Sequence, residues 1–140
     1  MNKVKLITGV IGDDVHNIGI KILEHALRDN GFEIVSLGIG VSQQEFIDAA
    51  IETKADGILV SSMSGHGKVL SEGFREKCME AGLTNILLYI GGHLIIGDDD
   101  WADVEKAFKD LGYDRVYPES TLPEEVIAAL KEDFKERGAL

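Results

Sequence analysis

The amino-acid sequence predicts an α/β protein in which five parallel strands and five helices form a doubly wound sheet. Short apolar runs alternate with longer segments whose apolar residues recur at helical spacing, from one end of the chain to the other. Glycines follow the expected helix ends at Gly31, Gly82 and Gly112, where a left-handed residue is favoured. The 140 residues suit one core, and no linker, repeat or low-complexity segment interrupts them, so we expect a single domain over residues 1–140.

The individual elements follow from local signals. Strands are expected at residues 4–9, 33–37, 57–61, 85–90 and 115–117, and helices at 18–30, 43–53, 69–81, 102–111 and 124–137. The first strand is apolar and β-branched. The first helix carries an apolar stripe at Ile18, Ile22, Leu23, Ala26 and Leu27.

The later helices have recognisable starts. Ser42 is an N-cap for the second helix, and Glu45 three residues later completes a capping box. The acidic run at 98–100 precedes the fourth helix, where negative charge is favourable, so we interpret it as a solvated cap rather than a metal site. Pro123 begins the last helix, where its missing N–H has no cost. Together these elements predict a flavodoxin-like sheet with the strand order 2-1-3-4-5.

Composition excludes several classes of partner and location. The chain has 14 Lys and Arg against 25 Asp and Glu, a net charge of −11, so we expect neither nucleic acid nor an anionic membrane surface as a partner. No apolar run approaches the roughly 20 residues of a membrane-spanning helix, and we expect no secretory signal before the first strand. Cys78 falls on the apolar spacing of its helix, which predicts a buried thiol in a cytoplasmic protein.

Three loops are expected to share the carboxyl edge of the sheet, where proteins of this architecture bind ligands. They follow the first, third and fourth strands and cover residues 13–19, 61–67 and 91–97. Their glycines permit close backbone approach to a bulky group, and Ser61 and Ser62 offer small hydroxyl donors. The apolar run at 94–96 indicates the wall of a slot. The loops therefore predict a deep, partly apolar slot, although tight strand–helix turns also use Gly and Ser.

The first of these loops carries Asp14, His16 and Gly19 in the spacing Asp-x-His-x-x-Gly. A histidine at the carboxyl end of a first strand is placed to meet a ligand. An aspartate two residues earlier can accept a hydrogen bond from one imidazole nitrogen, and such a pairing makes the imidazole a better, fixed metal ligand. The alternative is a solvated loop with an incidental histidine.

Other proteins of this fold do not match the loops. Receiver domains need an aspartate at the end of the third strand, where Ser61 and Ser62 stand, and a lysine after the fifth, where residues 117–119 offer none. Flavodoxins need a phosphate-binding loop after the first strand, and the acidic pair at 13–14 would repel a phosphate. A dinucleotide-binding Gly-x-Gly-x-x-Gly is absent there, and the histidines are too dispersed for a zinc site.

The three loops resemble the cobalamin-binding domains that carry the cofactor base-off, with a protein histidine on cobalt. That family's signature is Asp-x-His-x-x-Gly, then Ser-x-Leu, then Gly-Gly. The corresponding segments here are 14–19, 61–63 and 91–92, in the same order. Met63 replaces the usual Leu, which is a volume-conserving change.

Within that class the chain is similar to the small subunits of glutamate mutases over nearly its whole length. The segments that carry this resemblance are 49–56, 86–92 and 110–117. His66 and His93 depart from the pattern of those subunits, and both are expected beside the pocket, where they could meet corrin amides or a partner. His25 lies off the apolar stripe of its helix and is expected at the surface.

The resemblance implies a role for each loop residue. His16 would be the lower axial cobalt ligand, and Asp14 would accept a hydrogen bond from its other ring nitrogen. Gly19 would let the first helix pass close to the displaced nucleotide tail, and Ser61 would hydrogen-bond the benzimidazole nitrogen. Asp13, Val15 and Asn17 would contact the lower face of the corrin. Further cofactor contacts would come from Ser62, Met63, Gly91, Gly92, His93, Leu94, Ile95, Ile96 and Gly97.

By the same resemblance, the chain is the cobalamin-binding subunit of an adenosylcobalamin-dependent isomerase. The implied reaction is the radical rearrangement of L-glutamate to threo-3-methylaspartate, with the difficult chemistry supplied by the cofactor. We expect a large, barrel-type glutamate mutase subunit as partner, in a heterotetramer, and no activity from this chain alone. The alternatives are a corrinoid carrier for methyl transfer, the small subunit of a mutase that acts on an acyl-CoA, and a cobalamin sensor.

Overall fold

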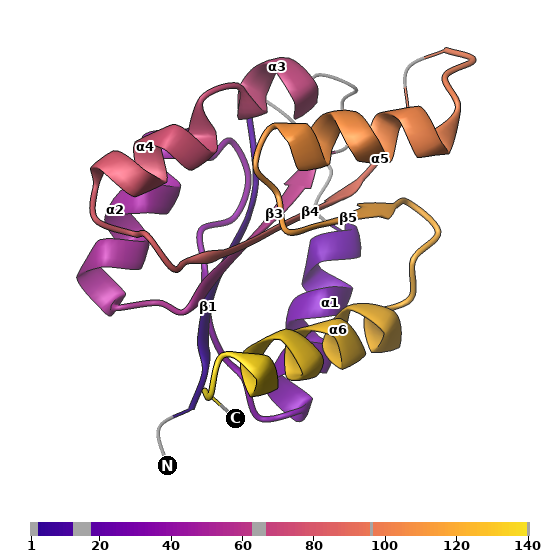
Figure 1. The fold of residues 1–140 in the computed structure, drawn as a ribbon. Coiled ribbons are helices and arrows are strands. Elements are labelled where there is room, and N and C mark those ends of the chain that lie inside the picture. The colour runs from indigo at the N-terminus through magenta and orange to yellow at the C-terminus, as the bar shows by residue number, and fades with distance from the viewer. Residues whose placement is uncertain (1–2, 13–17, 63–66, 96, 140) are drawn as a thin grey trace.

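The computed structural model describes residues 3–12, 18–62, 67–95 and 97–139, and within them it shows one parallel sheet with helices on both faces (Figure 1). The strands are β1 (Lys5–Val10), β2 (Glu33–Ser36), β3 (Gly57–Ser62), β4 (Leu87–Gly92) and β5 (Arg115–Pro118). They pair in the order β2-β1-β3-β4-β5, and every pairing is parallel. The predicted fold class and strand order are confirmed.

The helices cover the two faces of the sheet. They are α1 (Ile18–Asp29), α2 (Gln43–Thr53), α3 (Gly67–Ser71), α4 (Phe74–Glu80), α5 (Trp101–Asp110) and α6 (Pro123–Glu136). Helices α1 and α6 lie side by side on one face, and α2, α4 and α5 cover the other (Figure 1). Each face therefore has its own layer of apolar side chains, as a doubly wound sheet requires.

Large buried side chains fill both layers. Under α2, α4 and α5, the rings of Phe46 and Phe74 lie 5.8 Å apart between their centroids, and Cys78 is fully buried beside them. Burial raises the pKa of the Cys78 thiol to about 11, so it stays protonated and unreactive at neutral pH. Under α1 and α6, Leu27 and Leu130 are fully buried.

Most of the predicted caps are confirmed. The Ser42 hydroxyl accepts from the backbone N–H of Glu45 at 3.1 Å, and the Glu45 carboxylate accepts from the backbone N–H of Ser42 at 3.1 Å. Pro123 is the first residue of α6. Asp100 is the N-cap residue of α5, but its side chain makes no capping hydrogen bond, which fits a solvated acidic start.

The predicted helix at 69–81 is wrong, because two short helices replace it. Helix α3 ends at Ser71 and α4 begins at Phe74, since Gly73 takes a φ of 76° that a continuing helix cannot contain. The side-chain amide of Gln43 donates to the carbonyl oxygens of Leu70 and Glu72, at 2.6 and 2.9 Å. A side chain from α2 therefore satisfies carbonyl groups that the break leaves without helical partners.

The fourth strand also differs from its prediction at 85–90, because it runs from Leu87 to Gly92. Gly91 pairs with Ser61, and Gly92 pairs with Ser62, so both glycines belong to the sheet and not to a loop. Gly91 and Gly92 are therefore the last two paired residues of β4, at the carboxyl edge of the sheet.

Candidate functional site

A cavity of about 340 Å³ lies between α1 and α6, at the carboxyl ends of β3, β4 and β5. Gly19, Ile20 and Leu23 of α1 form one wall, and Pro123 and Val126 of α6 form the opposite wall. The strands and the chain beyond β5 contribute Leu59, Val60, Ser61, Tyr89, Ile90, Gly91, Gly92, Tyr117, Pro118, Glu119 and Thr121. The cavity is mainly apolar and sits where doubly wound sheets hold their ligands.

The depth of the cavity depends on Gly91. Ser61, Gly91 and Tyr117 are neighbours in one row across β3, β4 and β5. Because adjacent strands lie about 4.8 Å apart, Ser61 and Tyr117 are separated by roughly 10 Å across the missing side chain. A Cβ atom on Gly91 would lie 3.4 Å from Tyr117 Cβ and would occupy the gap between the two side chains.

A second row lies beneath the first and consists of Leu59, Tyr89 and Arg115. The rings of Tyr89 and Tyr117 are tilted against each other with centroids 5.8 Å apart. Leu59 and Tyr89 line the cavity below Ser61 and Gly91. The floor therefore combines an aliphatic side chain with two aromatic rings.

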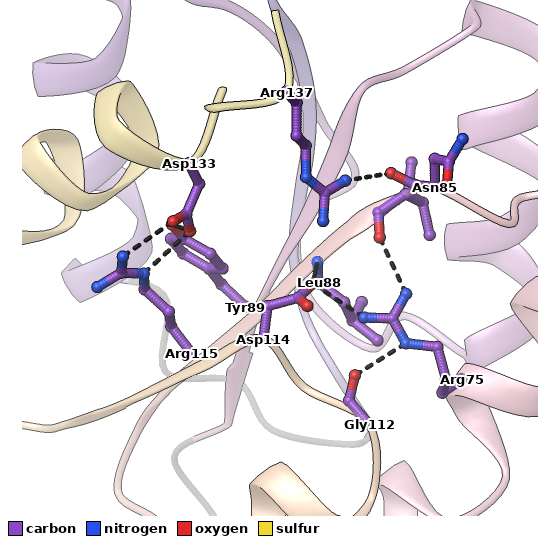
Figure 2. A network of polar contacts seen from close by, with 10 residues as sticks. Arg75, Asn85, Leu88, Tyr89, Gly112, Asp114, Arg115, Asp133 and Arg137 are labelled. Atoms are coloured by element: carbon purple, nitrogen blue, oxygen red, sulfur yellow. Dashed lines mark hydrogen bonds and ion pairs between the residues drawn. The ribbon is translucent and has the colours of Figure 1, made fainter. Parts of the chain in front are cut away.

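Asp133 of α6 anchors this floor (Figure 2). Arg115 donates to both carboxylate oxygens of Asp133 at 2.9 Å, and the Tyr89 hydroxyl donates to the same carboxylate. The hydrogen bonds from Arg115 hold the pKa of Asp133 below its usual range. Burial, together with the hydrogen bond to Asp133, raises the pKa of Tyr89. This cluster fixes the distance between α6 and the sheet, and hence the width of the cavity.

A different polar cluster in Figure 2 holds the edge of the sheet far from the cavity. Arg75 of α4 donates to the carbonyl oxygens of Ile86 and Gly112 at 2.9 and 2.8 Å, and to the Asp114 carboxylate at 2.9 Å. The same carboxylate accepts from the backbone N–H of Leu88 at 2.9 Å. These groups are structural, because they join α4, β4 and the start of β5.

A buried carboxyl group lies behind the α1 wall. The hydroxyl of Thr8 on β1 donates to Glu24 on α1 at 2.5 Å, and both residues are buried. Glu24 stands four residues after Ile20 and three before Leu27, on the face of α1 turned to the sheet. An acidic residue at helical spacing from apolar residues was the sequence signal for this pair.

Four of the predicted site residues are brought together by the structure. Gly19, Ser61, Gly91 and Gly92 all line the cavity. His93 stands at its rim, where its Nδ1 atom lies 2.9 Å from the carboxylate of Glu119, and both side chains are more than half exposed. This contact joins the chain after β4 to the chain after β5 at the rim.

Other predicted site residues lie elsewhere. Ser62 is buried on the opposite face of the sheet, close to Gly67. Leu94 is buried and Ile95 half-buried in the apolar layer under α2, α4 and α5, and neither lines the cavity. Gly97 is exposed. Their proposed contacts with a ligand remain predictions.

The remaining predicted residues lie outside the described part of the chain. They are Asp13, Asp14, Val15, His16, Asn17, Met63, His66 and Ile96. Five of them, residues 13–17, stand between Gly12, two residues after the end of β1, and Ile18, the first residue of α1. His25, in contrast, is described, and its side chain is 82% exposed and 3.4 Å from Asp29, as expected of a surface residue.

Sequence reasoning missed much of the cavity. Leu23, Tyr117, Pro123 and Val126 line it, although none was predicted as a site residue. Tyr117 could have been predicted, because it lies at the carboxyl end of the last strand and parallel strands all end at the ligand-binding edge of the sheet. Side chains alternate between faces along a strand, so one residue of each neighbouring pair there faces the cavity. The α6 residues carried no such signal, because their contribution depends on where that helix packs.

Residues 3–12, 18–62, 67–95 and 97–139 lack two features that would bear on the class of site. Within these residues, no three His, Cys, Asp or Glu side chains are grouped in a way that could hold a metal ion. No helix among them is long and apolar enough to cross a membrane.

Known proteins match this chain along nearly its full length. The B12 binding domain family matches residues 4–128. The glutamate mutase sigma subunits of Carboxydothermus hydrogenoformans and Clostridium tetani are each 55% identical to it over 96% of this chain and 98% of the relative. A cobalamin-binding protein from Desulfitobacterium hafniense has the same fold, with a TM-score of 0.76, 20% identity, and coverage of 93% of this chain and 58% of that longer chain. The chain therefore belongs to the B12-binding domain family and, within it, to the glutamate mutase sigma subunits.

Proposed function

We propose that this chain binds adenosylcobalamin and, with a larger subunit, supports the rearrangement of L-glutamate to threo-3-methylaspartate. One observation carries the proposal. The apolar cavity that contains Ser61, Gly91 and Gly92 lies at the carboxyl edge of the sheet, in a chain that is 55% identical to a glutamate mutase sigma subunit. As a single domain, residues 1–140 would supply the cofactor site, and the partner would supply the site for glutamate.

The chemistry of the cavity fits the nucleotide tail of a base-off cobalamin. Its volume of about 340 Å³ falls within the range of about 300–1,000 Å³ that is usual for small-molecule sites. Apolar and aromatic walls suit a flat benzimidazole, and the gap over Gly91 leaves room for it beside the Ser61 hydroxyl. Ser61 would donate a hydrogen bond to the ring nitrogen that no longer binds cobalt.

His16 is the proposed lower cobalt ligand, and Asp14 would accept a hydrogen bond from its second ring nitrogen. In the sequence the two residues stand between β1, which ends at Val10, and Gly19 of α1, which lines the cavity. Loss of the carboxylate partner of such a histidine typically weakens metal binding or activity by roughly 10–100-fold. When bound, the cofactor would supply the radical chemistry through its cobalt–carbon bond.

A partner subunit would have to cover the carboxyl edge. Ile39, Val69 and Leu122 follow three different strands, and these residues are 43%, 69% and 60% exposed. A partner that covers this edge would remove these apolar groups from water. We propose that a barrel-type large subunit binds there, in a cytoplasmic heterotetramer, and that the chain alone is inactive.

Electron paramagnetic resonance tests the central claim. Cob(II)alamin is mixed with the full chain carrying nitrogen-15 histidine, and the superhyperfine splitting of the cobalt signal is recorded. A doublet is expected, because one nitrogen-15 nucleus of a protein imidazole would be bound to cobalt. His16→Ala should abolish the doublet, and His25→Ala should leave it unchanged, since His25 is exposed on α1 and paired with Asp29.

A triplet identical to that of the free cofactor would refute the proposal, because the cofactor's own base would then remain on cobalt. Turnover of glutamate after the large subunit is added distinguishes a glutamate mutase from a methyl carrier or an acyl-CoA mutase subunit. Turnover by the chain alone would contradict the proposed division of labour.

A further inference from the structure

The last described residue before Asp14 and His16 is Gly12, and its backbone is bonded to the chain that leads into α2. The backbone N–H of Gly12 donates to the carbonyl oxygen of Val41 at 2.9 Å. The residue before it, Ile11, forms an isolated parallel bridge with Val41. Gly12 takes a φ of 79°, in the left-handed region that favours glycine. The chain is thus fixed here to the residue that directly precedes the N-cap of α2.

A side chain of α3 also lies against Gly12. A Cβ atom on Gly12 would lie only 2.5 Å from Leu70 Cδ1, so Leu70 occupies the space that any larger residue would need. Leu70 is partly buried and packs against the apolar layer under α2, α4 and α5. The position of Gly12 therefore depends on the position of α3.

Helix α3 is held by a residue of α2. With five residues, α3 is too short to be stable on its own, so its place depends on contacts from other elements. The side-chain amide of Gln43, the first residue of α2, donates to the carbonyl oxygens of Leu70 and Glu72 at 2.6 and 2.9 Å. Both amide protons are used, and a reversed amide would place its oxygen against two carbonyl oxygens. Gln43 therefore fixes the residue that contacts Gly12.

We infer that Gln43 is a positioning residue for the proposed cobalt ligand, His16. The contacts form a closed circuit at the carboxyl edge of the sheet. Gly12 is bonded to Val41, and Gln43 stands two positions after Val41. Gln43 in turn holds Leu70 against Gly12. The inference rests on the proposed function and adds to it a residue that acts through its neighbours.

A fixed starting point matters for a metal ligand. A side chain whose segment starts from an anchored residue loses less conformational entropy when it binds the metal. Metal sites also depend on residues that orient the ligands without touching the metal. Gln43 acts in this way through Leu70 and Gly12, so its loss should weaken the bond between cobalt and histidine.

Electron paramagnetic resonance measures this effect directly. Cob(II)alamin is titrated with the full chain carrying nitrogen-15 histidine, and the share of the signal that shows the doublet of a protein imidazole is followed. Gln43→Met removes both donors but keeps the length and the helix propensity of the side chain. It should raise the protein concentration needed for half of the doublet about three- to tenfold, the usual effect of one hydrogen bond.

Two variants separate positioning from a general loss of stability. Gln44→Met is the matched control, because Gln44 is the next residue of α2 and its amide bonds Asp48 at the surface. It should leave the titration unchanged. Arg75→Met removes hydrogen bonds to groups at the amino edge of the sheet. It should lower the urea midpoint of the apo chain at least as far as Gln43→Met does, without shifting the doublet.

A double variant tests the route through Leu70. Leu70→Ala removes the side chain that lies against Gly12, so by itself it should weaken the doublet to a similar degree. In that background Gln43→Met should have little further effect, because the amide then holds a helix that no longer contacts Gly12. Full additivity of the two changes would overturn the inference.

The remaining outcomes distinguish the inference from the proposed function. Equal titrations of wild type and Gln43→Met would overturn the inference, and so would an equal shift in Gln44→Met or Arg75→Met. The proposed function would survive these results, because the wild type would still give the doublet. A wild type that gives only the triplet of the free cofactor would refute the proposed function, and the inference with it.

Discussion

Asp133→Ala tests whether the cluster under the cavity holds α6 in place. The substitution removes the carboxylate that accepts hydrogen bonds from Tyr89 and from Arg115. The Tyr89 residue is only 2% exposed, so its hydroxyl would be left buried without its partner, at a cost of about 1–3 kcal/mol. The Arg115 side chain is 36% exposed and regains water, so loss of its ion pair should cost only about 0–1 kcal/mol.

We therefore expect Asp133→Ala to lower the free energy of unfolding by about 2 kcal/mol, most of it from the stranded hydroxyl. For a chain of this size that corresponds to a fall of about 6–8 °C in the melting midpoint. Urea unfolding of the apo chain gives the free energy directly. The key comparison is the same substitution in a Tyr89→Phe background, where no hydroxyl can be stranded and the cost should fall below about 1 kcal/mol. An equal cost in both backgrounds would show that Tyr89 is not the origin of the effect, and the reasoning would fail.

Three further predictions concern pH, the cavity and the broken helix. Because hydrogen bonds from Arg115 lower the folded-state pKa of Asp133, its contribution to stability is present above the unfolded pKa of about 3.9 and lost as the pH falls through the lower folded value. The urea midpoint of the wild type should thus fall more steeply below about pH 4 than that of Asp133→Asn, and parallel curves would contradict this sign. Gly91→Ala should weaken cobalamin binding about tenfold in equilibrium dialysis, because the new methyl group occupies the gap beside Tyr117. Binding of cobinamide, which has the corrin ring but lacks the nucleotide tail, should not change. Equal loss for both ligands would count against the gap as the tail site. Gly73→Ala should lower the unfolding free energy by about 1–2 kcal/mol, since φ is 76° and no atom blocks the Cβ; unchanged urea unfolding would show that the backbone there relaxes without cost.

The sheet could be predicted because its information is local. Alternating periods, caps such as Ser42 and the glycines that end helices all act within a few residues. The break at Gly73 was missed because apolar residues continue at helical spacing through it, from Leu70 to Phe74 and Cys78. What stabilises the break is the amide of Gln43, which is distant in sequence.

The candidate site was predictable only in part for a related reason. Ser61, Gly91 and Gly92 were expected, because small residues after a buried strand are visible in the sequence. Tyr117 joins them only once the register of β5 against β4 is known, and Val126 only once α6 is docked. Leu94 was assigned to the slot from its apolar character, and that character is equally satisfied by the core on the other face, where the residue lies.

The two facing walls of the cavity come from opposite ends of the chain, which has a consequence for biosynthesis. Helix α1 begins at Ile18, whereas α6 begins at Pro123 and comes after every strand of the sheet. During translation the α1 wall emerges early, but the space between the walls cannot exist until the final helix has left the ribosome and docked. Capture of a ligand in this cavity would therefore report that α6 has been made and has docked, and chains terminated before α6 would leave the ligand in solution.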